Sequence, residues 1–220
     1  MIRILSGLLL LVCGLVSAAE PAPPAARVIV LVRHGNYTPD ANADPALGPP
    51  LSALGVEQAK LVGPRLARLG HFDALYVSPL QRARDTAAAM RKNFPGQKFT
   101  VLPDLEECTP PTRVERIMAG EKQADLAACR AQLDRLFTAH FLPPDGQSRQ
   151  ELYVCHGNVI RYLVTRALGV DETAWLSMSV GHTSITRIRI EADGRMQVLS
   201  VGDVGHVPVN MQTGASGDRG

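Results

Sequence analysis

The chain has 220 residues and a formal net charge of +2, so its charge balance points to neither a nucleic-acid nor a membrane partner. It has no internal repeats and no interleaving of aromatic and basic residues. The length between the two ends suits one domain with a sizeable core.

The first residues have the pattern of a secretory signal peptide, which we predict over residues 1–19. A positive start precedes an apolar run that is short for a transmembrane helix, and small residues typical of a cleavage site follow. The alternative interpretation is a membrane anchor that is not cleaved. Residues 20–26 form a Pro/Ala-rich tether, residues 27–210 the folded domain and residues 211–220 a flexible tail. We therefore expect an exported protein, periplasmic or secreted, that has no membrane contact after cleavage.

The first predicted element is a buried strand over residues 28–32, a run of five apolar residues typical of a parallel sheet. The run ends abruptly at Arg33, His34 and Gly35. Ligands of open α/β sheets bind at the carboxyl ends of strands. Arg33 offers a planar set of donors for phosphate, and His34 offers a nitrogen nucleophile that is largely neutral near pH 7. We interpret His34 as the group that attacks a phosphorus atom.

An exposed loop over residues 37–51 follows, and Ser52 is expected to cap a helix that reaches residue 68. Pro64 predicts a kink or break in that helix. The next strand covers residues 72–77 and leads into a capping box in which Ser78 is the N-cap of a second helix. Arg82 then lies in the first turn of this helix, where amide groups favour an anion, and we assign it a phosphate contact.

A short strand over residues 99–102 precedes the adjacent carboxylates Glu106 and Glu107, a pattern that usually marks a solvated turn. An amphipathic helix is predicted over residues 123–140. Three cysteines remain after processing, which permits one disulfide and one free thiol. The sequence allows a Cys108–Cys129 bridge without establishing it, and Cys155, in a predicted buried strand, is expected to be free.

The strand over residues 151–155 runs into His156, which repeats the opening pattern of strand, histidine and glycine. A helix over residues 159–168 follows, and Gly181–Ser184 forms either a pocket rim or a plain loop. Asp193 and Gly194 predict a hairpin between strands 185–190 and 196–201. The order of elements predicts an α/β fold: a three-layer α/β/α sandwich whose mostly parallel sheet carries a C-terminal antiparallel hairpin.

The chain resembles the histidine phosphatase, or phosphoglycerate mutase-like, superfamily. The likeness rests on three motifs in the family's order, Leu31–Gly35, Ser78–Ala83 and Cys155–Gly157, and it covers nearly everything from Arg27 onwards. The latter half looks most like the mitochondrial serine/threonine protein phosphatase branch. The signal peptide departs from that branch, so its partners and oligomeric state do not carry over.

The resemblance implies a role for six residues. His34 is the nucleophile that becomes phosphohistidine, and Arg33, Arg82 and His156 complete the phosphate pocket. Glu107 protonates the leaving oxygen and then activates water, with Glu106 as the competing assignment. Asn36 is a further phosphate contact.

We therefore expect a phosphomonoesterase with no metal and no other cofactor, since two arginines and a second, protonated histidine can neutralise phosphate oxygens. Its substrate would be a phosphorylated small molecule, a glycan or a protein. Three alternatives remain open: a phosphomutase of the same fold, a catalytically silent module that binds phosphate or a protein, and a two-metal phosphatase.

Overall fold

The computed structural model describes residues 24–215. The predicted signal peptide, the first four residues of the tether and residues 216–220 lie outside the described residues. Ala26, predicted as the last residue of the tether, is the first residue of a strand. Residues 211–215, part of the predicted tail, accept hydrogen bonds from the side chains of Arg33, Gln58 and Ser179.

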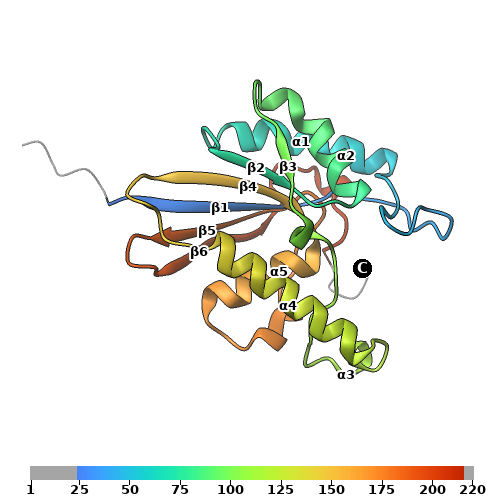
Figure 1. The fold of residues 1–220 in the computed structure, drawn as a ribbon. Coiled ribbons are helices and arrows are strands. Elements are labelled where there is room, and N and C mark those ends of the chain that lie inside the picture. Colours follow the sequence, from blue (N-terminus) through green and yellow to red (C-terminus); the bar gives the residue numbers. More distant parts are fainter. Residues whose placement is uncertain (1–23, 216–220) are drawn as a thin grey trace, which may run out of the picture.

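The centre of the fold is a six-stranded sheet with the order β3-β2-β4-β1-β5-β6. Strands β1 to β4 are parallel, β5 is antiparallel to β1, and β6 is antiparallel to β5 (Figure 1). This confirms the predicted α/β class with its C-terminal hairpin. The strands are β1 (Ala26–Arg33), β2 (Ala74–Val77), β3 (Phe99–Val101), β4 (Arg149–Cys155), β5 (Ile185–Glu191) and β6 (Met196–Asp203).

Helices cover both faces of the sheet, with α1 and α2 on one face and α4 and α5 on the other (Figure 1). The α-helices are α1 (Ala53–Ala67), α2 (Gln81–Met90), α3 (Glu115–Met118), α4 (Gln123–His140) and α5 (Gly157–Leu168). Short 3₁₀ helices are η1 (Arg91–Asn93), η2 (Pro103–Leu105), η3 (Glu172–Ser177) and η4 (Val209–Met211).

Alternate side chains of β1 enter two separate cores because successive residues of a strand point to opposite faces. Val30 and Val32 pack with α1 and α2, whereas Ile29 and Leu31 pack with α4 and α5. All four side chains are fully buried, as the uninterrupted apolar run predicts. The strand is thereby fixed on both faces, and its carboxyl end is held rigidly.

Two local predictions, a helix break at Pro64 and a helix cap at Ser78, were wrong. Helix α1 runs unbroken through Pro64, whose ring is exposed near the helix end, while its neighbours Val62 and Leu66 pack in the core. Helix α2 begins at Gln81 with Leu80 as its N-cap, so Ser78 does not cap it. The hydroxyl of Ser78 instead forms a hydrogen bond with His156.

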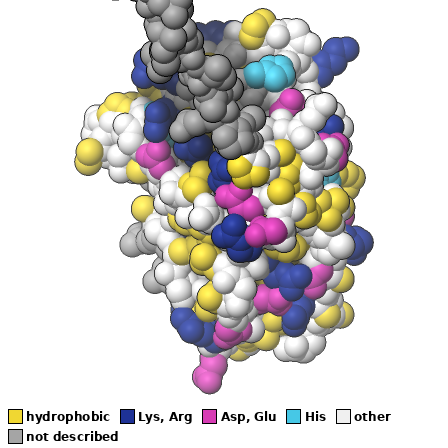
Figure 2. All heavy atoms as spheres, turned by 90° about the vertical axis from the view of Figure 1, so that its left-hand side faces the viewer, with side chains coloured by type: hydrophobic (Ala, Val, Ile, Leu, Met, Phe, Trp, Pro, Cys, Tyr) yellow, Lys and Arg dark blue, Asp and Glu magenta, His cyan; other side chains and the backbone are white. Residues whose placement is uncertain are grey.

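Figure 2 views the molecule from the left-hand side of Figure 1, where β1 begins. Acidic and basic side chains are interspersed over this face, as the low net charge suggests. Between residues 24 and 215, no helix combines the length and the apolar character that crossing a membrane requires.

Candidate active site

The pairing of β1 with β4 brings two distant histidines together. Arg33 and Cys155 are partners in the parallel register, so the residues that follow them, His34 and His156, leave the sheet side by side. The backbone N–H of His34 donates to the carbonyl of Cys155 at 2.9 Å. The two ring centroids lie 5.0 Å apart, and both side chains are buried.

The hydrogen bonds of His34 fix its tautomer. Its Nδ1 lies 2.7 Å from the carbonyl oxygen of Gly35, an acceptor, so Nδ1 carries the proton. Its Nε2 accepts a hydrogen bond from Nε of Arg82 at 3.1 Å. The lone pair available for attack therefore belongs to Nε2, on the side of the ring where Arg82 lies.

Both imidazoles are neutral in this pocket. Burial, followed by electrostatic repulsion between a protonated His34 and the neighbouring His156, Arg33, Arg82 and His182, lowers the pKa of His34 well below its usual value. Burial followed by Arg82 and Arg33 lowers the pKa of His156 in the same way. The prediction of a protonated second histidine thus disagrees with the pocket, whose guanidinium groups disfavour another positive charge.

The phosphate-binding arginines that the sequence predicts are both buried at this site. Arg33 uses Nη1 to donate to the carbonyls of Val180, at 2.7 Å, and Gly214, at 2.8 Å, while its buried Nε has no partner. Burial and then the charge of Arg161 lower the pKa of Arg33 to about 10. Burial also lowers the pKa of Arg82, whose guanidinium lies over the ring of Tyr37.

Glu107 approaches the second histidine from the loop after η2. Its Oε2 lies 3.8 Å from Nδ1 of His156, and both atoms are buried without a hydrogen-bond partner. The backbone N–H of Asn158 donates to Oε1 of Glu107 at 3.1 Å. The side chain of Glu106 is exposed instead, so of the two carboxylates only Glu107 is placed against an imidazole.

Asn36 lies beside the site but is bonded to the start of α1. Its side-chain oxygen accepts a hydrogen bond from the hydroxyl of Ser52 at 2.7 Å, and its backbone N–H donates to Gln58. Asn36 thus follows Gly35 closely behind His34, but its side-chain oxygen is engaged by Ser52.

Three further polar residues complete the site. Ser78 Oγ lies 2.7 Å from Nε2 of His156, and the ring of His182 lies 5.5 Å from that of His34. Arg161 is buried on α5 and places Nη1 next to Gly157. For His182 the sequence left two interpretations open, a pocket rim or a plain loop, and the structure supports the rim. Nothing in the sequence indicated that Ser78, predicted as a helix cap, or Arg161, in a predicted helix, would lie at the site.

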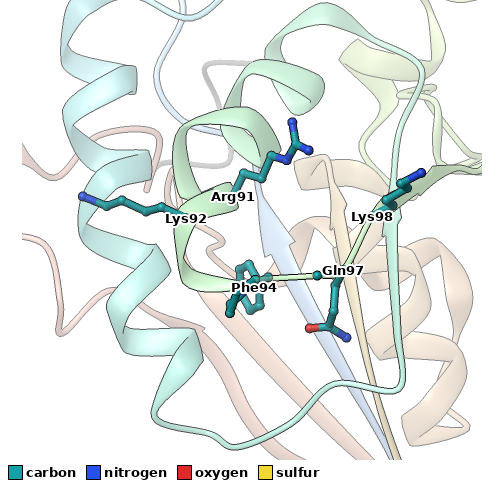
Figure 3. Close-up of a pocket in the computed structure, with 7 residues that line it drawn as sticks. Arg91, Lys92, Phe94, Gln97 and Lys98 are labelled. Atoms are coloured by element: carbon teal, nitrogen blue, oxygen red, sulfur yellow. The ribbon is translucent and has the colours of Figure 1, made fainter.

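The described residues do not group His, Cys, Asp or Glu side chains in threes that could hold a metal ion. A separate surface pocket lies between η1 and the start of β3, with Arg91, Lys92, Phe94 and Lys98 among its lining residues (Figure 3). Lys98 precedes the amino end of β3, whereas the imidazoles lie at the carboxyl ends of β1 and β4. This pocket therefore lies towards the amino ends of the parallel strands, away from the two imidazoles.

A buried imidazole whose unprotonated nitrogen accepts a hydrogen bond from an arginine, with a second arginine and a second imidazole beside it at the strand ends of an α/β sheet, is typical of proteins that handle phosphate through histidine. The family model for the histidine phosphatase superfamily (branch 1) matches residues 29–153 and 140–203. The chain belongs to the histidine phosphatase superfamily.

Curated relatives agree with this assignment. The mitochondrial serine/threonine-protein phosphatase Pgam5 of Caenorhabditis elegans is 36% identical over 198 residues, covering 87% of this chain and 68% of the relative. PGAM5 of Mus musculus is 32% identical over 189 residues, covering 84% of this chain and 65% of the relative. The chain thus spans about two thirds of the length of these relatives, and the comparisons identify it as a phosphatase.

Solved structures share the fold. A phosphoglycerate mutase from Plasmodium falciparum is 26% identical with a TM-score of 0.59, covering 84% of this chain and 96% of the other. Mycobacterial glucosyl-3-phosphoglycerate phosphatase with inorganic phosphate is 22% identical with a TM-score of 0.60, covering 83% of this chain and 100% of the other, a likeness of fold alone.

The comparisons contradict the predicted location. We expected an exported protein, periplasmic or secreted, from the pattern of residues 1–19. The similar curated proteins from worm, frog and mouse are mitochondrial, so that expectation was wrong. An apolar run after a positive start is a compositional signal only, which explains how it misled.

Proposed function

We propose that this chain is a metal-independent phosphomonoesterase that works through a phosphohistidine formed on Nε2 of His34. The observation that carries the proposal is the tautomer of His34: Nδ1 is occupied by the carbonyl of Gly35, and Nε2 keeps its lone pair beside Arg82. A nucleophile needs this lone pair at neutral pH, and the lowered pKa of His34 provides it.

The first step transfers the phosphoryl group to the protein. Arg82 exchanges its hydrogen bond to Nε2 of His34 for one to the phosphate, which releases the lone pair. Nε2 then attacks phosphorus while the bond from phosphorus to the ester oxygen breaks. Arg82 and Arg33 neutralise the equatorial oxygens, and His156 binds them through Nδ1, which has no other partner. Glu107 gives its proton to the leaving oxygen, so the alcohol departs uncharged.

The second step reverses the roles. Glu107, now a carboxylate, takes a proton from a water molecule that attacks phosphorus. The bond between phosphorus and Nε2 breaks, which returns His34 to its neutral form and releases inorganic phosphate. Arg33 and Arg82 are both buried, and neither forms an ion pair among the salt bridges of the described residues, so their positive charges favour binding of a dianionic monoester.

The proposed substrate class is phosphoserine and phosphothreonine in proteins or peptides, because the curated relatives are named serine/threonine-protein phosphatases. A phosphomutase of the same fold would instead transfer the phosphoryl group to a second acceptor. Incubation with a phosphoglycerate followed by product analysis separates transfer from release.

The test of the mechanism is a pair of variants assayed with p-nitrophenyl phosphate, whose leaving group needs little protonation. We expect His34→Ala to abolish turnover and to prevent capture of acid-labile phosphohistidine. Glu107→Ala should retain slow turnover, because general acid help is typically worth ~10²–10⁴ in rate and is least needed here. Complete loss in both variants would contradict the division of roles, and phosphohistidine on His34→Ala would disprove the nucleophile.

A further inference from the structure

The loop that carries Glu107 is fastened to two helices on the α4/α5 side of the sheet. Cys108, the next residue, forms a disulfide with Cys129 in α4. Gln132 of α4 donates to the carbonyl of Glu106 at 2.8 Å. From α5, the side chain of Asn158 donates to the carbonyl of Cys108 at 3.1 Å. The backbone around Glu107 is therefore held from both sides.

These restraints leave the two oxygens of Glu107 in different states. The N–H of Asn158 occupies Oε1, whereas Oε2 has no hydrogen-bond partner and faces Nδ1 of His156 at 3.8 Å. A carboxyl group that donates and then accepts a proton needs one oxygen free and aimed at the reacting atoms. The orientation that frees Oε2 depends on where the loop lies relative to α5.

We propose that the Cys108–Cys129 disulfide and Asn158 are positioning groups for Glu107, and that the disulfide makes the acid–base step sensitive to thiol reductants. The inference rests on the proposed role of Glu107. A dithiol reductant transfers two electrons and two protons to the Sγ–Sγ bond, becomes a disulfide itself and leaves two thiols on the protein. The loop then loses its covalent link to α4 and keeps only hydrogen bonds.

Reduction should leave the phosphate pocket intact because its groups come from other elements. Arg33 ends β1 and His34 follows it, Arg82 lies in α2, and His156 lies between β4 and α5. Helix α4 also stays packed without the disulfide, through three fully buried leucines, Leu126, Leu133 and Leu136. Only the step that requires Glu107 should change.

Leaving-group dependence separates these effects. We would measure kcat/KM, which reports the transfer step, for phenyl phosphate and for p-nitrophenyl phosphate in the oxidised chain, the reduced chain and the Cys108→Ala/Cys129→Ala variant. With the acid misplaced, phenyl phosphate should lose roughly 10-fold or more, part of the ~10²–10⁴ that general acid catalysis supplies, and p-nitrophenyl phosphate should change far less. Inhibition by inorganic phosphate should stay constant.

Controls assign the change to the disulfide. Reductant should not affect the double variant further, reoxidation should restore the wild-type ratio, and circular dichroism of the reduced wild type checks its fold if the double variant does not fold. Asn158→Leu keeps the backbone N–H but removes the side-chain bonds to Cys108 and Arg161, and should shift the substrate ratio in the same direction. Unchanged inhibition by inorganic phosphate would show that loss of the Arg161 bond leaves the phosphate pocket intact.

The outcomes are distinguishable. If Glu107→Gln discriminates between the two substrates but reduction does not, the positioning role of the disulfide is wrong and the acid assignment stands. An equal loss on both substrates after reduction also overturns the positioning role. If Glu107→Gln shows no discrimination, both the acid assignment and this inference fail.

Discussion

At the scale of single residues, burial and the positive surroundings of His34 keep its imidazole from becoming a cation, as the proposed role of nucleophile requires. Arg33, Arg82 and burial each oppose its protonation, so the ring keeps its lone pair at the pH where phosphate monoesters are dianions. The carbonyl of Gly35 holds the proton on Nδ1, so Nε2 is the nitrogen without a proton. The same environment lowers the pKa of His156 and so holds it neutral. A bound dianion would raise that pKa.

Ser78 is the residue whose role the sequence missed most clearly, and its substitution tests the orientation of His156. Ser78→Ala removes the hydrogen bond to Nε2, so the ring should lose its fixed orientation. We expect kcat/KM to fall by roughly 10-fold, since one such hydrogen bond is worth ~1–2 kcal/mol. Steady-state kinetics measures this. Ser78→Thr, which keeps the hydroxyl, should recover most of the activity; equal loss in both variants would argue against the hydrogen bond.

At the scale of elements, the site depends on a close approach of α1 to the residues after β1. A Cβ placed on Gly55 would lie 2.0 Å from the carbonyl oxygen of Asn36, and one on Gly35 would lie 2.5 Å from the carbonyl oxygen of Gly55. Only glycine lets these two backbones meet. The first turn of α1 thereby fixes the position of the segment that follows His34.

Substitution of Gly55 tests this packing. Replacing glycine by alanine at an unobstructed helix position stabilises the folded state by up to ~1 kcal/mol. At Gly55, however, the added Cβ would clash with the backbone of Asn36. We expect Gly55→Ala to lower the free energy of unfolding by about 1–3 kcal/mol, the usual cost of overpacking. Urea denaturation measures the change. Gly120→Ala is the matched control, because its Cβ would meet nothing nearer than 3.6 Å. A neutral Gly55→Ala would show that α1 can move away at no cost.

At the scale of the whole molecule, the buried neutral histidines couple stability to pH. Burial, followed by Arg33 and Arg82, lowers the pKa of His182 from 6.5 to about 3. Below pH 6.5 the unfolded chain binds a proton that the folded chain excludes. The contribution of His182 is therefore fully present above pH 6.5 and is lost as the pH falls from there towards 3, at about 1.4 kcal/mol per pH unit.

The His182→Asn variant cannot titrate at this position and should remove that part of the slope. We expect the free energy of unfolding, measured by urea denaturation between pH 6 and 5, to depend on pH less steeply than in the wild type by about 1.4 kcal/mol per pH unit. His71→Asn, at an exposed position between α1 and β2, controls for loss of an imidazole as such. Identical slopes in the wild type and His182→Asn would mean that His182 accepts its proton in the folded state.

Much of the fold was predictable because local patterns agree with it. The apolar run of β1, the amphipathic pattern of α4 and the Asp193–Gly194 turn predict elements that the structure contains with the expected type and order. The free thiol of Cys155 was also expected and is buried. Predictions based on one local signal were less secure: Pro64 does not break α1, and the capping residues at Ser78 do not start α2 there.

The sequence by itself determined that two strands end in a histidine and a glycine, and that arginines lie at such strand ends, because these are properties of short consecutive stretches. Only the tertiary structure decided which of these groups meet: the pairing of β1 with β4, the contact of Arg82 with the unprotonated Nε2 of His34, the position of Glu107 rather than Glu106 beside His156, and the bond between Cys108 and Cys129. The physical reason is that contacts between distant residues depend on strand register and on the packing of loops against helices. No local pattern of residues encodes these.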